Sequence, residues 1–235
     1  MANVAFRVFV AIFVYLCKAC AQNRASGNDM NGETEERLKE IKRSFRMMMN
    51  GVAAQSMRDK GLDYHVNWGA SLPMLKAKAN EIGKDYDLAI ALWKEDVREC
   101  KVLATLVMPA ERMLPEVVDI WMEQTRSQEV AELASLNLYQ HLPFAAEKAY
   151  RWIASDKELY QLCGFHVLSR LFMNGQEPNE RGINEYVDQL QVALQGESMA
   201  VRKAAMASAL RFAELGLVYE RLAKSALKRL GLELF

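Results

Sequence analysis

Residues that form turns are scarce in this chain. Its 235 residues include only 12 glycines and 5 prolines, so few turns are encoded and long helices are expected. No run of alternating apolar and polar residues is bounded by hairpin turns, which argues against a β-rich fold. The composition, 51% hydrophobic and 26% charged, is globular and excludes a disordered chain. These features favour an all-α fold.

Cysteine and histidine are also sparse. Four cysteines are too few for a disulfide-dense protein, and Cys17 with Cys20 has no second pair to complete a zinc site. The three histidines are scattered, and we expect His166, in an apolar helical pattern, to be a core or groove histidine. We therefore predict no metal site. Cys100 and Cys163 are predicted to be buried free thiols.

The chain has no excess of either charge, because 30 basic and 30 acidic side chains cancel. A global basic field that would attract nucleic acid is thus excluded. The charges are unevenly placed, since residues 197–235 hold seven basic and four acidic side chains, whereas residues 81–136 hold six and twelve. Motifs for phosphate loops, dinucleotides, zinc proteases and serine hydrolases are absent, and no catalytic triad can be argued.

The one long apolar run, residues 8–17, is too short to span a bilayer. Arg7 precedes it, and small residues flank Cys20 after it. This pattern is typical of a secretory signal, with Gln22 as the first mature residue.

A start site assigned too early explains the same segment equally well, because Met30 opens a stretch that reads like the start of a helical domain. We treat residues 1–29 as a signal-like or mis-called extension and residues 30–235 as one helical-repeat domain. We expect a cytoplasmic protein with no membrane association, although the apolar run leaves secretion open.

From Thr34 onward the apolar residues recur at spacings of three and four, which is typical of amphipathic helices. A unit of two helices then recurs, and its first helix reaches a tryptophan at Trp93, Trp121 and Trp152, 28 and 31 residues apart. A fourth unit over residues 183–215 lacks the tryptophan. This period predicts a HEAT-like helical-repeat solenoid, an α-α superhelix, with the tryptophans as packing residues.

The second helices of these units are expected to line one side of the stack, where solenoids form a concave binding surface. They are predicted near residues 96–107, 128–140, 158–172 and 198–213.

One acidic stretch lies at the start of the helix predicted near residues 128–140. Ser127 suits the N-cap, Gln128 and Glu132 share a face because they are four residues apart, and Glu129 suits the first turn. Two interpretations stay open. The glutamates are solvated capping residues, or they present a carboxylate on the concave surface.

Several segments resemble the DNA alkylation repair glycosylases of the AlkD type, over about residues 45–215. The resemblance rests on the order and spacing of short motifs. They are NWGASLPMLK at 67–76, LW at 92–93 with RECKVLA at 98–104, SQEVAE at 127–132, the helix around Trp152, and CGF at 163–165.

This resemblance implies a concave DNA-binding face and the excision of cationic N3- or N7-alkylated purines from duplex DNA without a cofactor. Where the family motif has Trp-Asp and then the catalytic Asp, this chain has Gln128, Glu129 and Glu132. Glu132 is then the stabilising carboxylate, Glu129 a secondary acid and Gln128 a polar neighbour of the lesion. Cys163 stands where an arginine is expected, and the helix around residues 203–211 lacks the family's second aromatic residue.

The partner implied is duplex DNA, bound by a monomer. The candidate phosphate contacts are Arg126, Arg170, Arg202, Lys203 and Arg211. Two alternatives remain, namely a non-catalytic HEAT-repeat scaffold that binds DNA or protein, and a secreted repeat protein if the signal is genuine.

Overall fold

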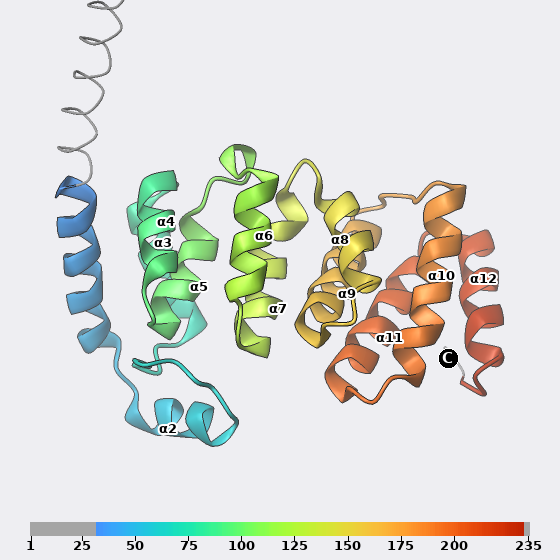
Figure 1. Ribbon diagram of the computed structural model, residues 1–235, viewed down its shortest axis with the longest axis horizontal. Coiled ribbons are helices and arrows are strands. Elements are labelled where there is room, and N and C mark those ends of the chain that lie inside the picture. Colours follow the sequence, from blue (N-terminus) through green and yellow to red (C-terminus); the bar gives the residue numbers. More distant parts are fainter. Residues whose placement is uncertain (1–31, 233–235) are drawn as a thin grey trace, which may run out of the picture. The chain divides into compact units, whose positions relative to one another are not determined.

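The computed structural model describes residues 32–232, and this part of the chain is helical with no β-strand (Figure 1). The chain divides into two compact units, residues 1–47 and 48–235. In the first, residues 32–44 are α-helical and lead into the 3-10 turn η1 (Phe45–Met48). Among the described helices, none has the length and apolarity needed to cross a membrane. Both interpretations of residues 1–29 lie outside the described residues.

The second unit contains two lone helices at its start, four helix pairs and one final helix, which confirms the predicted helical-repeat fold. In chain order they are α2 (Gly51–Asp59), α3 (Leu72–Ile82), α4 (Tyr86–Lys94) with α5 (Arg98–Val107), α6 (Pro115–Gln124) with α7 (Gln128–Asn137), α8 (Ala145–Ile153) with α9 (Glu158–Met173), α10 (Glu180–Gln195) with α11 (Met199–Ala213), and α12 (Leu217–Lys228). Two 3-10 turns, η2 (Ala110–Arg112) and η3 (Tyr139–His141), lie in the connections.

Short polar side chains begin five of these helices. Each accepts a hydrogen bond from the backbone N–H three residues further on, which satisfies one of the donors that a helix start leaves unpaired. These caps are Asn50 for α2, Asp85 for α4, Ser127 for α7, Asn179 for α10 and Ser198 for α11.

The pairs stack so that like helices meet. The second helices α5, α7, α9 and α11 pack against one another in succession, as the sequence predicted. The first helices form the other layer, because Trp93 of α4 stacks on Trp121 of α6, and Lys148 of α8 pairs with Asp119 of α6 at 2.5 Å. We call the exposed side chains of α5, α7, α9 and α11 the inner row.

The recurring tryptophans are packing residues, as predicted. The rings of Trp93 and Trp121 are almost parallel, with centroids 4.1 Å apart, and both side chains are buried. The indole N–H of Trp93 donates to Gln124 at 3.0 Å. Trp152 is buried against Tyr139, with ring centroids 5.2 Å apart. Each tryptophan thus lies buried in the last turn of the first helix of its unit, although Trp152 packs on a tyrosine instead of another tryptophan.

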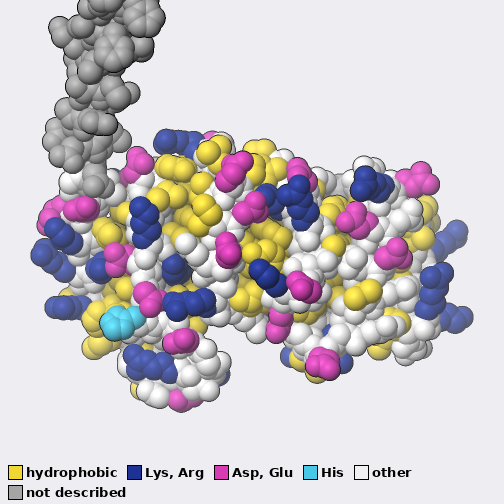
Figure 2. All heavy atoms as spheres, in the orientation of Figure 1, with side chains coloured by type: hydrophobic (Ala, Val, Ile, Leu, Met, Phe, Trp, Pro, Cys, Tyr) yellow, Lys and Arg dark blue, Asp and Glu magenta, His cyan; other side chains and the backbone are white. Residues whose placement is uncertain are grey.

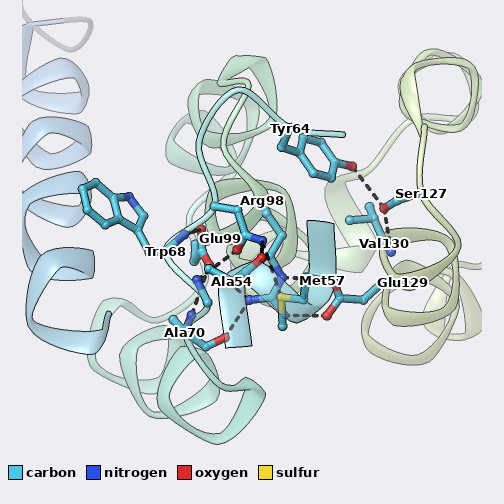
Figure 3. A network of polar contacts seen from close by, with 12 residues as sticks. Ala54, Met57, Tyr64, Trp68, Ala70, Arg98, Glu99, Ser127, Glu129 and Val130 are labelled. Carbon is cyan, nitrogen blue, oxygen red and sulfur yellow. Dashed lines mark hydrogen bonds and ion pairs between the residues drawn. The ribbon is translucent and has the colours of Figure 1, made fainter. Parts of the chain in front are cut away.

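A buried arginine joins α5, α7 and the segment that precedes α3 (Figure 3). The guanidinium of Arg98 donates to both carboxylate oxygens of Glu129 on α7, at 2.9 and 2.5 Å. Its Nη1 also donates to the carbonyl oxygen of Ala70 at 2.6 Å and to Glu99 at 3.2 Å. Glu99 beside it accepts the backbone N–H groups of Trp68 and Ala70, each at 3.2 Å. Three parts of the chain distant in sequence are therefore held by one charge network.

The segment before α3 also contacts the start of α7 directly. The hydroxyl groups of Tyr64 and Ser127 lie 3.3 Å apart, and Ser127 is the N-cap of α7. In the same segment, Gly69 has a φ of +71°, and a Cβ there would lie 2.3 Å from the Asn50 carbonyl oxygen. Only glycine fits this close approach. The first turn of α7 is thus fixed from outside its own repeat.

Because the network is largely buried, breaking it has a large free-energy cost. Arg98 is only 2% exposed and Glu99 is fully buried. Burial by itself lowers the pKa of the Arg98 guanidinium, but Glu129 and Glu99 outweigh it and raise the pKa overall. The arginine is charged, and a buried charge without its partners carries a large desolvation cost.

We expect Arg98→Ala to lower the free energy of unfolding by about 3 kcal/mol, because two carboxylates and a carbonyl lose their donor. Urea denaturation followed by circular dichroism measures this change. Arg126→Ala is the matched control, since its ion pair with Asp96 is half exposed and is worth less than about 1 kcal/mol. Equal losses in the two variants would contradict a structural role for Arg98.

Candidate functional site

The three acidic-stretch residues predicted as a site are divided between two environments. Both oxygens of Glu129 are occupied by Arg98, so this carboxylate holds α5 to α7. Glu132, one turn further along, takes no part in that network. Its Oε1 accepts a hydrogen bond from the side-chain amide of Gln128 at 2.7 Å. Glu132 is therefore the carboxylate of this stretch that remains available for a ligand.

The Glu132 carboxylate lies on the inner row and is open to solvent. Its side chain is 41% exposed, and within the described residues its Oε2 has no hydrogen-bond partner. The hydrogen bond from Gln128 restricts the rotation of the carboxylate, since it fixes Oε1. One oxygen is thus oriented and the other can face a ligand.

His166 of α9 joins this site, which sequence reasoning did not predict. Its Nε2 lies 3.9 Å from Oε1 of Glu132, and its side chain is 34% exposed. Burial lowers the pKa of His166 below its ordinary value, and Arg170 adds to this effect while Glu132 opposes it. The ring is therefore uncharged at neutral pH. The one signal in the sequence was that both residues belong to second helices, which does not reveal their register.

Three of the predicted phosphate contacts have no carboxylate partner among the described residues. Arg170 lies on α9, and Arg202 and Lys203 lie within the first five residues of α11. The guanidinium groups of the two arginines contact methionine sulfur atoms, at 3.8 Å for Arg170 and 3.9 Å for Arg202. The Nε atom of Arg202 is buried without a partner. These cations are available to an anionic ligand.

The other two predicted contacts are already paired. Arg211 is 2.7 Å from Glu214, the C-cap of the same helix, and Arg126 pairs with Asp96. Basic side chains also gather over α12 at one end of the second unit, whereas the face of α4, α6, α8 and α10 mixes both signs (Figure 2). The exposed cations on or next to α12 are Arg221, Lys224, Lys228 and Arg229.

Aromatic side chains are missing from much of the inner row. α7 contains no aromatic residue, and Phe212, the one aromatic residue of α11, is buried. Cys163 does not substitute for a surface arginine, because it is buried and its Sγ donates to the Ala131 carbonyl oxygen at 3.4 Å. Burial raises the pKa of this thiol to about 12. Cys100 and Cys163 are buried, as predicted.

The described part of the chain contains no group of three or more His, Cys, Asp or Glu side chains that could hold a metal ion. The chemistry available at this site is thus that of one exposed carboxylate, one uncharged imidazole, one amide and nearby cations.

Comparison with known proteins agrees with the helical-repeat fold. A solved structure described as a new family related to the HEAT-like repeat DNA glycosylases, with affinity for branched DNA structures, superposes with a TM-score of 0.72. It shares 16% sequence identity over 81% of each chain, so the likeness shows the fold alone. No curated protein matches. The sequence model for the DNA alkylation repair enzymes matches residues 34–230. The chain therefore belongs to the DNA alkylation repair enzyme family.

Proposed function

We propose that this protein binds duplex DNA along the inner row and excises a cationic N3- or N7-alkylated purine, with Glu132 as the stabilising carboxylate. The observation that carries this proposal is the placement of Glu132. It is exposed on α7, and its Oε2 has no hydrogen-bond partner among the described residues. The next two helices of the same row carry Arg170, Arg202 and Lys203 without carboxylate partners.

DNA binding follows from these cations. Phosphate contacts supply most of the sequence-independent affinity of a DNA-binding protein, and each contact releases counterions from the duplex. Arginine suits the task because its planar guanidinium can donate two parallel hydrogen bonds to one phosphate. A row of cations on neighbouring helices supports contact with successive phosphates of a strand.

The excision chemistry needs little from the protein. An alkylated purine already carries a positive charge, so it departs as a neutral base and leaves positive charge on the sugar at C1′. A carboxylate fixed beside C1′ stabilises that charge, as in glycoside hydrolysis. Glu132 has the required charge, and the hydrogen bond from Gln128 orients it.

A DNA-binding scaffold without catalysis is the second candidate. It is favoured by Gln128, which replaces an aromatic side chain of related glycosylases, and by the absence of any aromatic residue on α7. An amide offers no ring face to a cationic base. The affinity for branched DNA described for the similar structure suggests branched DNA as the ligand of such a scaffold.

Removing the unpaired cations should weaken binding to a linear duplex. We expect Arg170→Ala, Arg202→Ala and Lys203→Ala each to reduce the slope of log affinity against log salt by about one. Fluorescence anisotropy at several salt concentrations measures this slope. Arg151→Ala is the control, because Arg151 lies on α8 and pairs with Glu147. A triple variant with the affinity and salt slope of the parent would exclude the inner row as the DNA-binding surface. Tighter binding of the parent protein to branched DNA than to the linear duplex would favour the scaffold.

Glu132→Gln should reduce the release of 7-methylguanine or 3-methyladenine from methylated duplex DNA by at least about 100-fold. The substitution keeps the size of the side chain while removing its charge, so folding and DNA affinity should be unchanged. Glu123→Gln, an exposed glutamate of α6, is the control. Undiminished release by Glu132→Gln contradicts the assigned role. No release from the parent protein, with DNA still bound, identifies the scaffold.

A further inference from the structure

We propose that His166 is a second catalytic residue of this site, whose imidazole, together with Glu132, holds the water that attacks C1′ and accepts its proton. The inference rests on the proposed base excision and adds the group that activates the nucleophile.

The geometry suits a shared water. Nε2 of His166 and Oε1 of Glu132 are 3.9 Å apart, which is too long for a direct hydrogen bond. A water placed about 2.8 Å from each atom can bridge them at this separation. Both side chains are about one-third to two-fifths exposed, so solvent reaches the position. Because α7 and α9 pack together, the two groups are held by rigid elements.

With two side chains at the site, Glu132 can stabilise the charge at C1′ while His166 accepts the proton of the water. Glu132 must stay charged while positive charge develops at C1′, so accepting a proton would cancel its own contribution. A histidine is suited to take that proton near neutral pH. The bond between C1′ and the purine nitrogen breaks, and its electron pair leaves with the neutral base. The water oxygen then bonds to C1′, and its proton passes to Nε2. The resulting imidazolium is stabilised by the adjacent carboxylate.

The charges around His166 keep its ring ready to accept a proton. Glu132 faces it from α7, and Arg170 lies one turn along its own helix. Among the described residues, no charged side chain of α8, η3 or α11, which also pack against α9, adds to these effects on the pKa of His166. Burial, followed by the charge of Arg170, lowers the pKa of His166 below 6.5 despite Glu132. The uncharged ring therefore predominates at pH 7, and it is lost only as the pH falls through this lowered pKa.

The test is the pH profile of base release in single turnovers, with protein in excess over methylated duplex DNA, from about pH 5 to pH 8. The parent rate should fall on the acid side, below pH 6.5. His166→Gln and His166→Ala should lose about 100-fold at neutral pH and should lack this acid fall. Their DNA affinity at pH 7 should equal that of the parent. His141→Gln, an exposed histidine in η3, is the matched control and should keep the parent profile.

The outcomes separate this inference from the proposed function. In the first outcome, the parent releases base, Glu132→Gln does not, and both His166 variants keep the rate of the parent and its fall at acid pH. His166 then has no catalytic role, and the proposed excision stands. If the His166 variants are slow but retain the acid fall, the residue acts only on packing and the inference is overturned. If the parent releases no base at all, both the excision and this inference are overturned, whereas DNA binding is judged by its own salt slope.

Discussion

The ion pair between the buried Arg98 and the partly exposed Glu129 is the contact on which the arrangement of the site depends. It crosses from one repeat to the next, and through Glu99 it also holds the segment that precedes α3. Packing between repeats in a solenoid is made largely by apolar side chains, which tolerate small shifts along the helix axis. A bidentate contact between a guanidinium and a carboxylate does not tolerate such shifts. It therefore sets the position of the first turn of α7.

This contact also assigns different roles to two neighbouring glutamates. Glu129 is used to hold α7, and Glu132, three residues later, lies outside that network. The proposed DNA surface, the proposed excision and the proposed role of His166 all follow from the position of Glu132 on the inner row. The unpaired cations of α9 and α11 extend the same surface, while Arg126 and Arg211 are neutralised by their own partners.

Much of the fold could be predicted from the sequence, because helical periodicity and the spacing of Trp93, Trp121 and Trp152 are local and regular signals. The helix pairs, the row of second helices and the buried thiols are all as expected. Less of the candidate site could be predicted from the sequence. The sequence places Glu129 and Glu132 together, and only the register between repeats shows that Arg98 reaches one of them. The proximity of His166 to Glu132 depends on the same register, which no pattern within a single helix contains.

The central claim is that Glu129 is structural and Glu132 is not. The most direct test is the free energy of unfolding of Glu129→Gln beside that of Glu132→Gln, measured by urea denaturation. The account predicts a loss of about 2 kcal/mol for Glu129→Gln, because Arg98 stays buried with one charged partner fewer. Glu132→Gln should stay within about 0.5 kcal/mol of the parent, as for other exposed positions. Equal losses, or a larger loss for Glu132→Gln, would contradict the account.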